Sequence, residues 1–198
     1  MQRASKWMLV AFLGVSLIIL GLAVPFAFSM LASRQPASQG LHLKGNVDIF
    51  VYDQSGKVKD ERHFDNLMVS AGVEGIASRI SPHDGSVNSS TPYNYIALGT
   101  SNIAADAAQT ALVAELPSGP NYARVQDASA QYTTAGGNKI ILSVTFLPDQ
   151  ATGTLRESGI FNSVSGGNML ARQTFAPDIQ KAAADTLTVT WTITLSPT

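Results

Sequence analysis

The first part of this chain has a different pattern of apolar and polar residues from the rest. No charged residue lies between Lys6 and Arg34, and the intervening sequence is almost entirely apolar. At a helical rise of about 1.5 Å per residue, about 20 apolar residues cross a bilayer. We therefore expect a single transmembrane helix at residues 7–32. A cytoplasmic tail at residues 1–6 precedes it, and a polar linker at residues 33–40 follows it.

A cleaved secretory signal is the alternative interpretation of the same segment. Arg3 and Lys6 precede the apolar run, and the small residues Ala27 and Ser29 resemble a cleavage site. The run is longer than the usual signal core of about 7–15 residues, which favours a retained helix. Both interpretations place the rest of the chain outside the cytoplasm, in the periplasm or at the cell surface. The basic residues before the run favour a cytoplasmic N-terminus.

Small residues within the apolar run fall on one face of the expected helix. Ala11, Gly14 and Gly21 are spaced so that they lie along one side. Such a face lets two membrane helices approach closely, so it is a candidate contact within the lipid bilayer. Ordinary glycine usage in a membrane helix is the alternative explanation.

Residues 41–198 show the two-residue period of β-strands. In Thr186–Leu195, five apolar residues alternate with five threonines, which is typical of a half-buried antiparallel strand. Leu41–Asp53 alternates in the same way. With Lys57–Phe64 it predicts a hairpin, whose second strand carries the charges of an exposed edge.

Further short strands are expected between turns rich in glycine and polar residues. They are Tyr93–Leu98, Tyr122–Tyr132, Lys139–Leu147, Thr154–Phe161 and Met169–Phe175.

Two segments are expected to be helical. Val69, Val73 and Ile76 recur at helical spacing and predict one amphipathic helix at about residues 67–80. Ala107–Leu116 is expected to make about two helical turns. Many short strands with one amphipathic helix predict a mainly β domain at residues 41–198, an antiparallel β-sandwich of jelly-roll-like type.

The composition of this domain excludes several functional classes. All 14 acidic residues lie beyond residue 34 with no basic stripe, which argues against nucleic acid as a partner. Cysteine is absent, so there is no disulfide, cysteine-based zinc site or thiol nucleophile. His42, His63 and His83 lack the spacing of metal-binding motifs, and the common nucleophile and phosphate-binding motifs are absent. We therefore expect no cofactor, no metal and no catalytic residues.

An internal ion pair is the main candidate among the charged residues. Arg156 and Glu157 are adjacent on an expected strand, so their side chains are expected on opposite faces of the sheet. Glu157 then shares a face with Leu155 and points inward. A buried carboxylate needs a partner, and Arg124 or Arg172 would supply it.

Three tyrosines lie near expected loops. Tyr93, Tyr95 and Tyr122 are candidates for a rim that contacts a partner protein, because interfaces are enriched in tyrosine. Half-exposed structural aromatics are the alternative explanation.

Several stretches resemble a β-sandwich module of tailed-phage structural proteins, including predicted tail-fibre and virion-associated proteins. They are NLMVSAG at Asn66–Gly72, YIALGT at Tyr95–Thr100, TLRESGIF at Thr154–Phe161, LAR at Leu170–Arg172 and DTLTVTW at Asp185–Trp191. They are similar to that module's NLV-x-x-G, YIALGTG, T-x-x-E-A-G-L-F and LLAR…DTLTVTYTL. The resemblance implies a β-sandwich over about residues 66–195 that acts as a binding or structural part. It carries over no functional residues, and the expected membrane helix departs from it.

Two functions follow as hypotheses. The first is a non-enzymatic structural subunit, held in the lipid bilayer by an uncleaved helix. Its extracytoplasmic domain would dock on other subunits of a membrane complex or a membrane-containing virion, or on copies of itself. Tethering raises the local concentration at such a docking surface, so weak contacts suffice. The alternative is a secreted or surface adhesin, or an appendage subunit, with a cleaved leader. In its filament version, Leu41–Asp53 would add to a neighbour's sheet.

Overall fold

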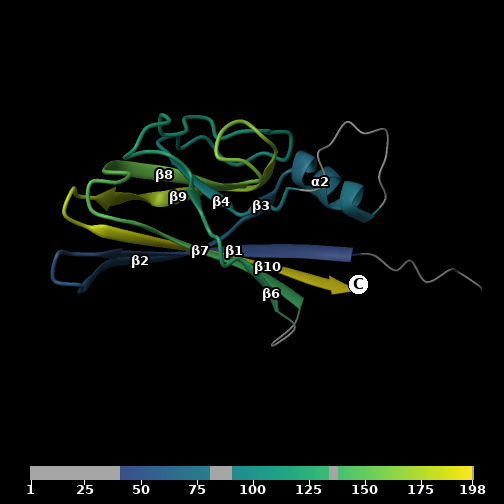
Figure 1. The fold of residues 1–198 in the computed structure, drawn as a ribbon, viewed down its shortest axis with the longest axis horizontal. Helices are drawn as coiled ribbons and strands as arrows, with labels where there is room; N and C mark the ends of the chain where they lie inside the picture. The colour runs from purple at the N-terminus through teal and green to yellow at the C-terminus, as the bar shows by residue number, and fades with distance from the viewer. Residues whose placement is uncertain (1–40, 81–90, 134–137, 198) are drawn as a thin grey trace, which may run out of the picture. The chain divides into compact units, whose positions relative to one another are not determined.

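In the computed structural model, the alternating pattern of the sequence becomes two antiparallel β-sheets that face each other (Figure 1). The structure describes residues 41–80, 91–133 and 138–197, and Leu41–Thr198 form one compact unit. The prediction of a mainly β, antiparallel, two-sheet domain with one short helix is confirmed.

The first sheet has the strand order β2-β1-β10-β7-β6. Its strands are β1 (Leu41–Tyr52), β2 (Val58–Asp65), β6 (Gln131–Thr133), β7 (Asn138–Phe146) and β10 (Thr186–Pro197). The predicted hairpin of β1 and β2 is present. β1 also pairs with β10 along its whole length, from Leu41 opposite Pro197 to Tyr52 opposite Thr186. The first strand of the domain therefore lies inside its own sheet, between two neighbours.

The second sheet has the strand order β3-β9-β8-β4-β5. Its strands are β3 (Leu67–Met68), β4 (Tyr95–Gly99), β5 (Val125–Gln126), β8 (Gly153–Phe161) and β9 (Met169–Lys181). The helix α2 (Ser70–Ile80) packs against β9. This sheet carries the site described below on the face that points away from the first sheet.

The main core lies between the two sheets and is built from the apolar faces that the sequence predicts. Val47, Ile49 and Val51 of β1 are buried, as are the apolar residues of β10 from Leu187 to Ile193. Trp191 is fully buried, and its indole Nε1 donates a hydrogen bond to Ser158 Oγ at 3.3 Å. A buried indole N–H needs such an acceptor, so this bond joins the two sheets through their core.

The expected helix at residues 67–80 begins later in the structure. Leu67 and Met68 form β3 and pair with β9, and Val69 donates its backbone N–H to Leu170 O at 3.2 Å. Sheet pairing therefore takes these residues, and α2 starts at Ser70. Val73, which is expected on the apolar face of the helix, is 47% exposed.

Two other sequence predictions are corrected. Ala107–Leu116 is not helical; it contains turns and a single β-bridge between Glu115 and Gly99. The expected strand Tyr122–Tyr132 is divided between β5 and β6, which belong to different sheets. The division falls at Asp127, whose Oδ1 accepts hydrogen bonds from the N–H and hydroxyl of Ser129 at 2.8 Å each. This turn interrupts the strand.

Within the described part of the chain, no helix is both long and apolar enough to cross a bilayer. The expected transmembrane helix at residues 7–32 lies outside the described residues. So do its candidate packing face at Ala11, Gly14 and Gly21, the tail at residues 1–6 and the linker at residues 33–40. These stay predictions.

Candidate functional site on the outer face of the second sheet

A layer of irregular chain, residues 100–124, covers part of the outer face of the second sheet. Leu112 of this layer is buried with Phe161 and Met169, in a small apolar cluster separate from the main core. The backbone of the layer is joined to the sheet at Leu116, whose N–H donates to Leu98 O of β4 at 2.9 Å. Within the layer, the Thr100 N–H donates to Ala114 O at 2.9 Å.

An irregularity in β8 decides which side chains face this layer. The register between β8 and β9 shifts between Leu155 and Glu157. Leu155 belongs to the core between the sheets, whereas Glu157 contacts the outer layer. Arg156 also reaches this layer, since its Nη1 donates to Thr100 O at 3.3 Å, next to the Ser101 N–H that Glu157 accepts at 3.4 Å. The expectation that Glu157 shares a face with Leu155, opposite Arg156, was therefore wrong. A bulge interrupts the alternation of side chains on which it relied.

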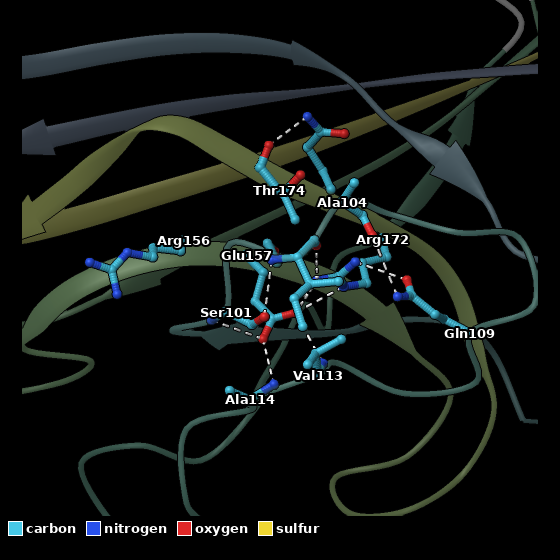
Figure 2. A network of polar contacts seen from close by, with 12 residues as sticks. Ser101, Ala104, Gln109, Val113, Ala114, Arg156, Glu157, Arg172 and Thr174 are labelled. Carbon is cyan, nitrogen blue, oxygen red and sulfur yellow. Dashed lines mark hydrogen bonds and ion pairs between the residues drawn. The ribbon is translucent and has the colours of Figure 1, made fainter.

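Glu157 and Arg172 form a fully buried ion pair under the outer layer (Figure 2). Arg172 Nε and Nη2 each lie 2.8 Å from Glu157 Oε2. Arg172 also donates from Nη1 to Gln109 Oε1 and from Nη2 to Ile103 O, at 2.8 Å each. The guanidinium therefore connects strand β8 to two points of the outer layer.

The carboxylate of Glu157 adds further connections to the same layer. Its Oε1 accepts the backbone N–H of Ala114 at 2.7 Å, and its Oε2 accepts that of Val113 at 3.1 Å. Gly99, which lies opposite Glu157 in the sheet, leaves room for this side chain. A Cβ atom at position 99 would lie 2.5 Å from Glu157 Oε1 and 2.6 Å from Ala114 O. These bonds explain why residues 107–116 are not helical. The N–H groups of residues 113 and 114 bind the Glu157 carboxylate, and that of Leu116 binds strand β4, so none of them is available for a helical hydrogen bond.

Arg124 does not pair with Glu157; it forms a second ion pair with Glu115. Arg124 Nε lies 2.6 Å from Glu115 Oε1, and Nη2 lies 2.9 Å from Oε2. Nη1 donates to Ser163 O at 2.9 Å and to Gly166 O at 2.8 Å. The guanidinium carbon also lies 3.5 Å from the centre of the Phe161 ring, a cation–π contact. This side chain, only 6% exposed, joins the outer layer to the turn between β8 and β9.

A surface cleft of about 270 Å³ opens beside this second ion pair. It lies between the segment 115–124 and the turn after β8. The lining residues are Glu115, Leu116, Ser118, Tyr122, Ala123, Arg124, Val164, Ser165 and Gly166. Tyr122 and Val164 are exposed to solvent at 39% and 56%. The cleft thus combines apolar and hydroxyl-bearing side chains with the Arg124–Glu115 ion pair as its charged floor.

The three candidate rim tyrosines have different surroundings. The hydroxyl of Tyr93 lies against Gly75 of α2, and Tyr95 is half-buried against the small apolar cluster of the outer face. Tyr122 is the exposed one of the three, and it lines the cleft.

A third charged cluster lies at the turn between β9 and β10. Lys181 is buried and donates from Nζ to Leu147 O at 3.0 Å and Asp185 O at 2.7 Å. Its burial lowers its pKa, because the charged form loses hydration. The Lys59 ammonium, 2.6 Å from Asp185 Oδ2, lowers the pKa of that carboxyl. These contacts hold the turn together.

Among the described residues, no three histidine or acidic side chains are grouped so as to hold a metal ion. No protein-family model matches the chain, and no curated protein matches it. The resemblance to the phage module stays a prediction.

Two partners in this site were missed by the sequence analysis. Glu115 and Gln109 lie in the segment that was expected to be helical, and the pattern around them carries no sign of an internal contact. One signal in the sequence points to them: two arginines are candidates for a single carboxylate, so the second arginine needs a carboxylate of its own.

Proposed function

We propose that this protein is a non-enzymatic structural subunit, held in a membrane by an uncleaved N-terminal helix at residues 7–32. Its extracytoplasmic domain, a jelly-roll-like sandwich, docks on other subunits of a larger assembly. One observation supports this proposal: the buried arginine side chains bind other groups of the same chain. Arg172 and Arg124 donate hydrogen bonds to carboxylates, a side-chain amide and backbone carbonyls of the same chain. These bonds hold the loops against the second sheet.

These structural roles of the buried charges favour a protein-docking domain over an enzyme active site. A catalytic group needs access to substrate and a pKa near the working pH, whereas Glu157 and Arg172 are fully buried against each other. A rigid loop layer suits a docking part, because little conformational entropy is lost when a pre-ordered surface binds.

The pairing of β1 favours an anchored subunit over a strand-donating filament. β1 is bonded on one side to β10 along its whole length and on the other side to β2. Donating Leu41–Asp53 to a neighbour would break both pairings, so the filament version of the alternative requires partial unfolding.

Purification of the native full chain in a mild detergent tests the proposal. We expect one or a few membrane-associated proteins to co-purify in fixed ratio and to cross-link to residues 41–198. Recovery as a lone monomer at native abundance would contradict docking. Intact-mass measurement tests the anchor separately: a mature chain that begins near Met30 would replace the anchored subunit with the secreted alternative.

The secreted or surface adhesin remains a second candidate because of one observation, the cleft beside Tyr122. A domain that only docks on other proteins does not need a pre-formed pocket with fixed polar groups. A domain that binds a small ligand does need one.

A further inference from the structure

The cleft beside Arg124 has the features of a small-molecule site. Ligand sites are concave, are lined by apolar and aromatic groups and carry a few fixed polar groups; their usual volume is about 300–1,000 Å³. This cleft, at about 270 Å³, lies just below that range. It therefore suits a single small ring and not an extended chain.

The polar floor of the cleft is pre-organised. Four N–H groups of Arg124 are used by Glu115, Ser163 and Gly166, and the guanidinium lies on the Phe161 ring. The fifth N–H, on Nη2, has no partner among the described residues. Each Glu115 oxygen accepts one N–H from Arg124, and a carboxylate oxygen has a second acceptor site. A donor and an acceptor thus stand side by side.

The charge of the floor favours a neutral ligand. Arg124 and Glu115 cancel each other, so neither an anion nor a cation gains net attraction. A hydroxyl group both donates and accepts, and neighbouring hydroxyls on a ring match an adjacent donor and acceptor. Ser118, Ser165 and Tyr122 line the same cleft and add further hydroxyl groups.

The walls favour a ligand that also has an apolar face. Tyr122 and Val164 both line the cleft and are exposed. The C–H face of a pyranose ring is apolar and weakly positive, and it complements the negative face of an aromatic ring.

We propose that this cleft binds one neutral hexopyranose unit of a glycan, with its hydroxyls on Arg124 and Glu115 and a ring face on Tyr122. The proposal stands on the cleft alone, so it holds for an anchored or a released domain.

Saturation-transfer NMR on the full chain tests this. The detergent must be zwitterionic and free of sugar. The probes are the methyl glycosides of glucose, galactose, mannose and N-acetylglucosamine at roughly 10 mM, a concentration at which a site of millimolar affinity is mostly occupied. We expect saturation transfer to at least one probe. Tyr122→Phe should keep it, and Tyr122→Ala should weaken affinity about tenfold, the effect of losing about 1.4 kcal/mol of ring contact.

Two further variants make the result specific to the cleft. Ser165→Trp places a large side chain in the cleft from an exposed position and should abolish transfer. Tyr52→Ala removes an aromatic side chain from the first sheet and should leave transfer unchanged. Circular dichroism confirms that each variant is folded. Absence of transfer to all four probes, or equal transfer in wild type and Ser165→Trp, overturns the proposal, and neither result bears on whether the chain is anchored.

Discussion

Arg172 Nη2 lies 2.8 Å from Glu157 Oε2, and neither side chain exposes any surface to solvent. The two residues sit on neighbouring strands, β9 and β8, and both also bond to the outer layer. A buried ion pair stabilises a fold only when the other donors and acceptors of its two side chains also have hydrogen-bond partners. Here the layer itself satisfies them, so the fold of residues 100–116 and the burial of the pair depend on each other.

Glu157→Gln should strongly destabilise the domain. The substitution leaves Arg172 charged, buried and without a countercharge, which costs about 3–5 kcal/mol in comparable buried pairs. Denaturant unfolding of the full chain measures the loss. Glu61→Gln is the matched control, because Glu61 is exposed and should change stability by less than about 1 kcal/mol. Equal stability of the two variants would show that the pair contributes nothing.

Gly99→Ala should displace the Glu157 carboxylate. The added methyl group would lie 2.5 Å from Glu157 Oε1 and 2.6 Å from a backbone oxygen that cannot move independently. We expect a loss of about 1–3 kcal/mol and faster hydrogen exchange at the Val113 and Ala114 amides. Gly119→Ala is the control, since a Cβ there meets nothing within 4 Å. Unchanged exchange at both amides in Gly99→Ala would contradict the close approach.

Ser158→Ala should destabilise the core between the sheets. Ser158 Oγ accepts the indole N–H of Trp191 and donates to Ala97 O at 3.0 Å. The variant leaves the indole N–H buried without an acceptor, at a cost of about 1–3 kcal/mol. Trp191 fluorescence and thermal unfolding report the change. Ser143→Ala, which removes an exposed hydroxyl paired with Thr190, should have little effect. A similar loss in both variants would mean that burial of the bond does not matter.

Stability should depend on pH through His63. Its Nδ1 lies 2.6 Å from Asp48 Oδ1 and its Nε2 lies 3.1 Å from Glu61 Oε1. Hydrogen bonds to these carboxylates, first Asp48 and then Glu61, raise the pKa of His63 above its ordinary value. A raised pKa means that folding favours the protonated form. The contribution is therefore complete below about pH 6.5 and is lost as the pH rises through the folded-state pKa.

His63→Gln tests this dependence. We expect the variant to melt at a lower temperature than wild type near pH 5, and the difference to shrink at pH 9, where the imidazole is neutral. His63 is exposed, so the effect should be small. A difference that grows with pH would have the wrong sign and would contradict the assignment.

Much of the strand pattern could be predicted, because alternation is a local property. Val47, Ile49 and Val51 are buried as their spacing requires, and so are the apolar residues of β10. The prediction failed where a side chain competed for backbone N–H groups, either from a distant strand or within a local turn. Glu157 takes the N–H groups of residues 113 and 114, and Asp127 divides an expected strand.

The residue pattern alone shows which faces of the long strands are apolar, that the buried charged groups need internal partners, and that the first 34 residues differ from the rest. Which charged groups meet depends on how the strands and loops are brought together in the folded chain. Arg172 pairs with Glu157 because the register shift between Leu155 and Glu157 turns the Glu157 side chain to the outer face. Arg124 pairs instead with Glu115 of the outer layer. The position of a bulge depends on contacts between residues far apart in the chain, and alternation within one strand does not show where the bulge lies.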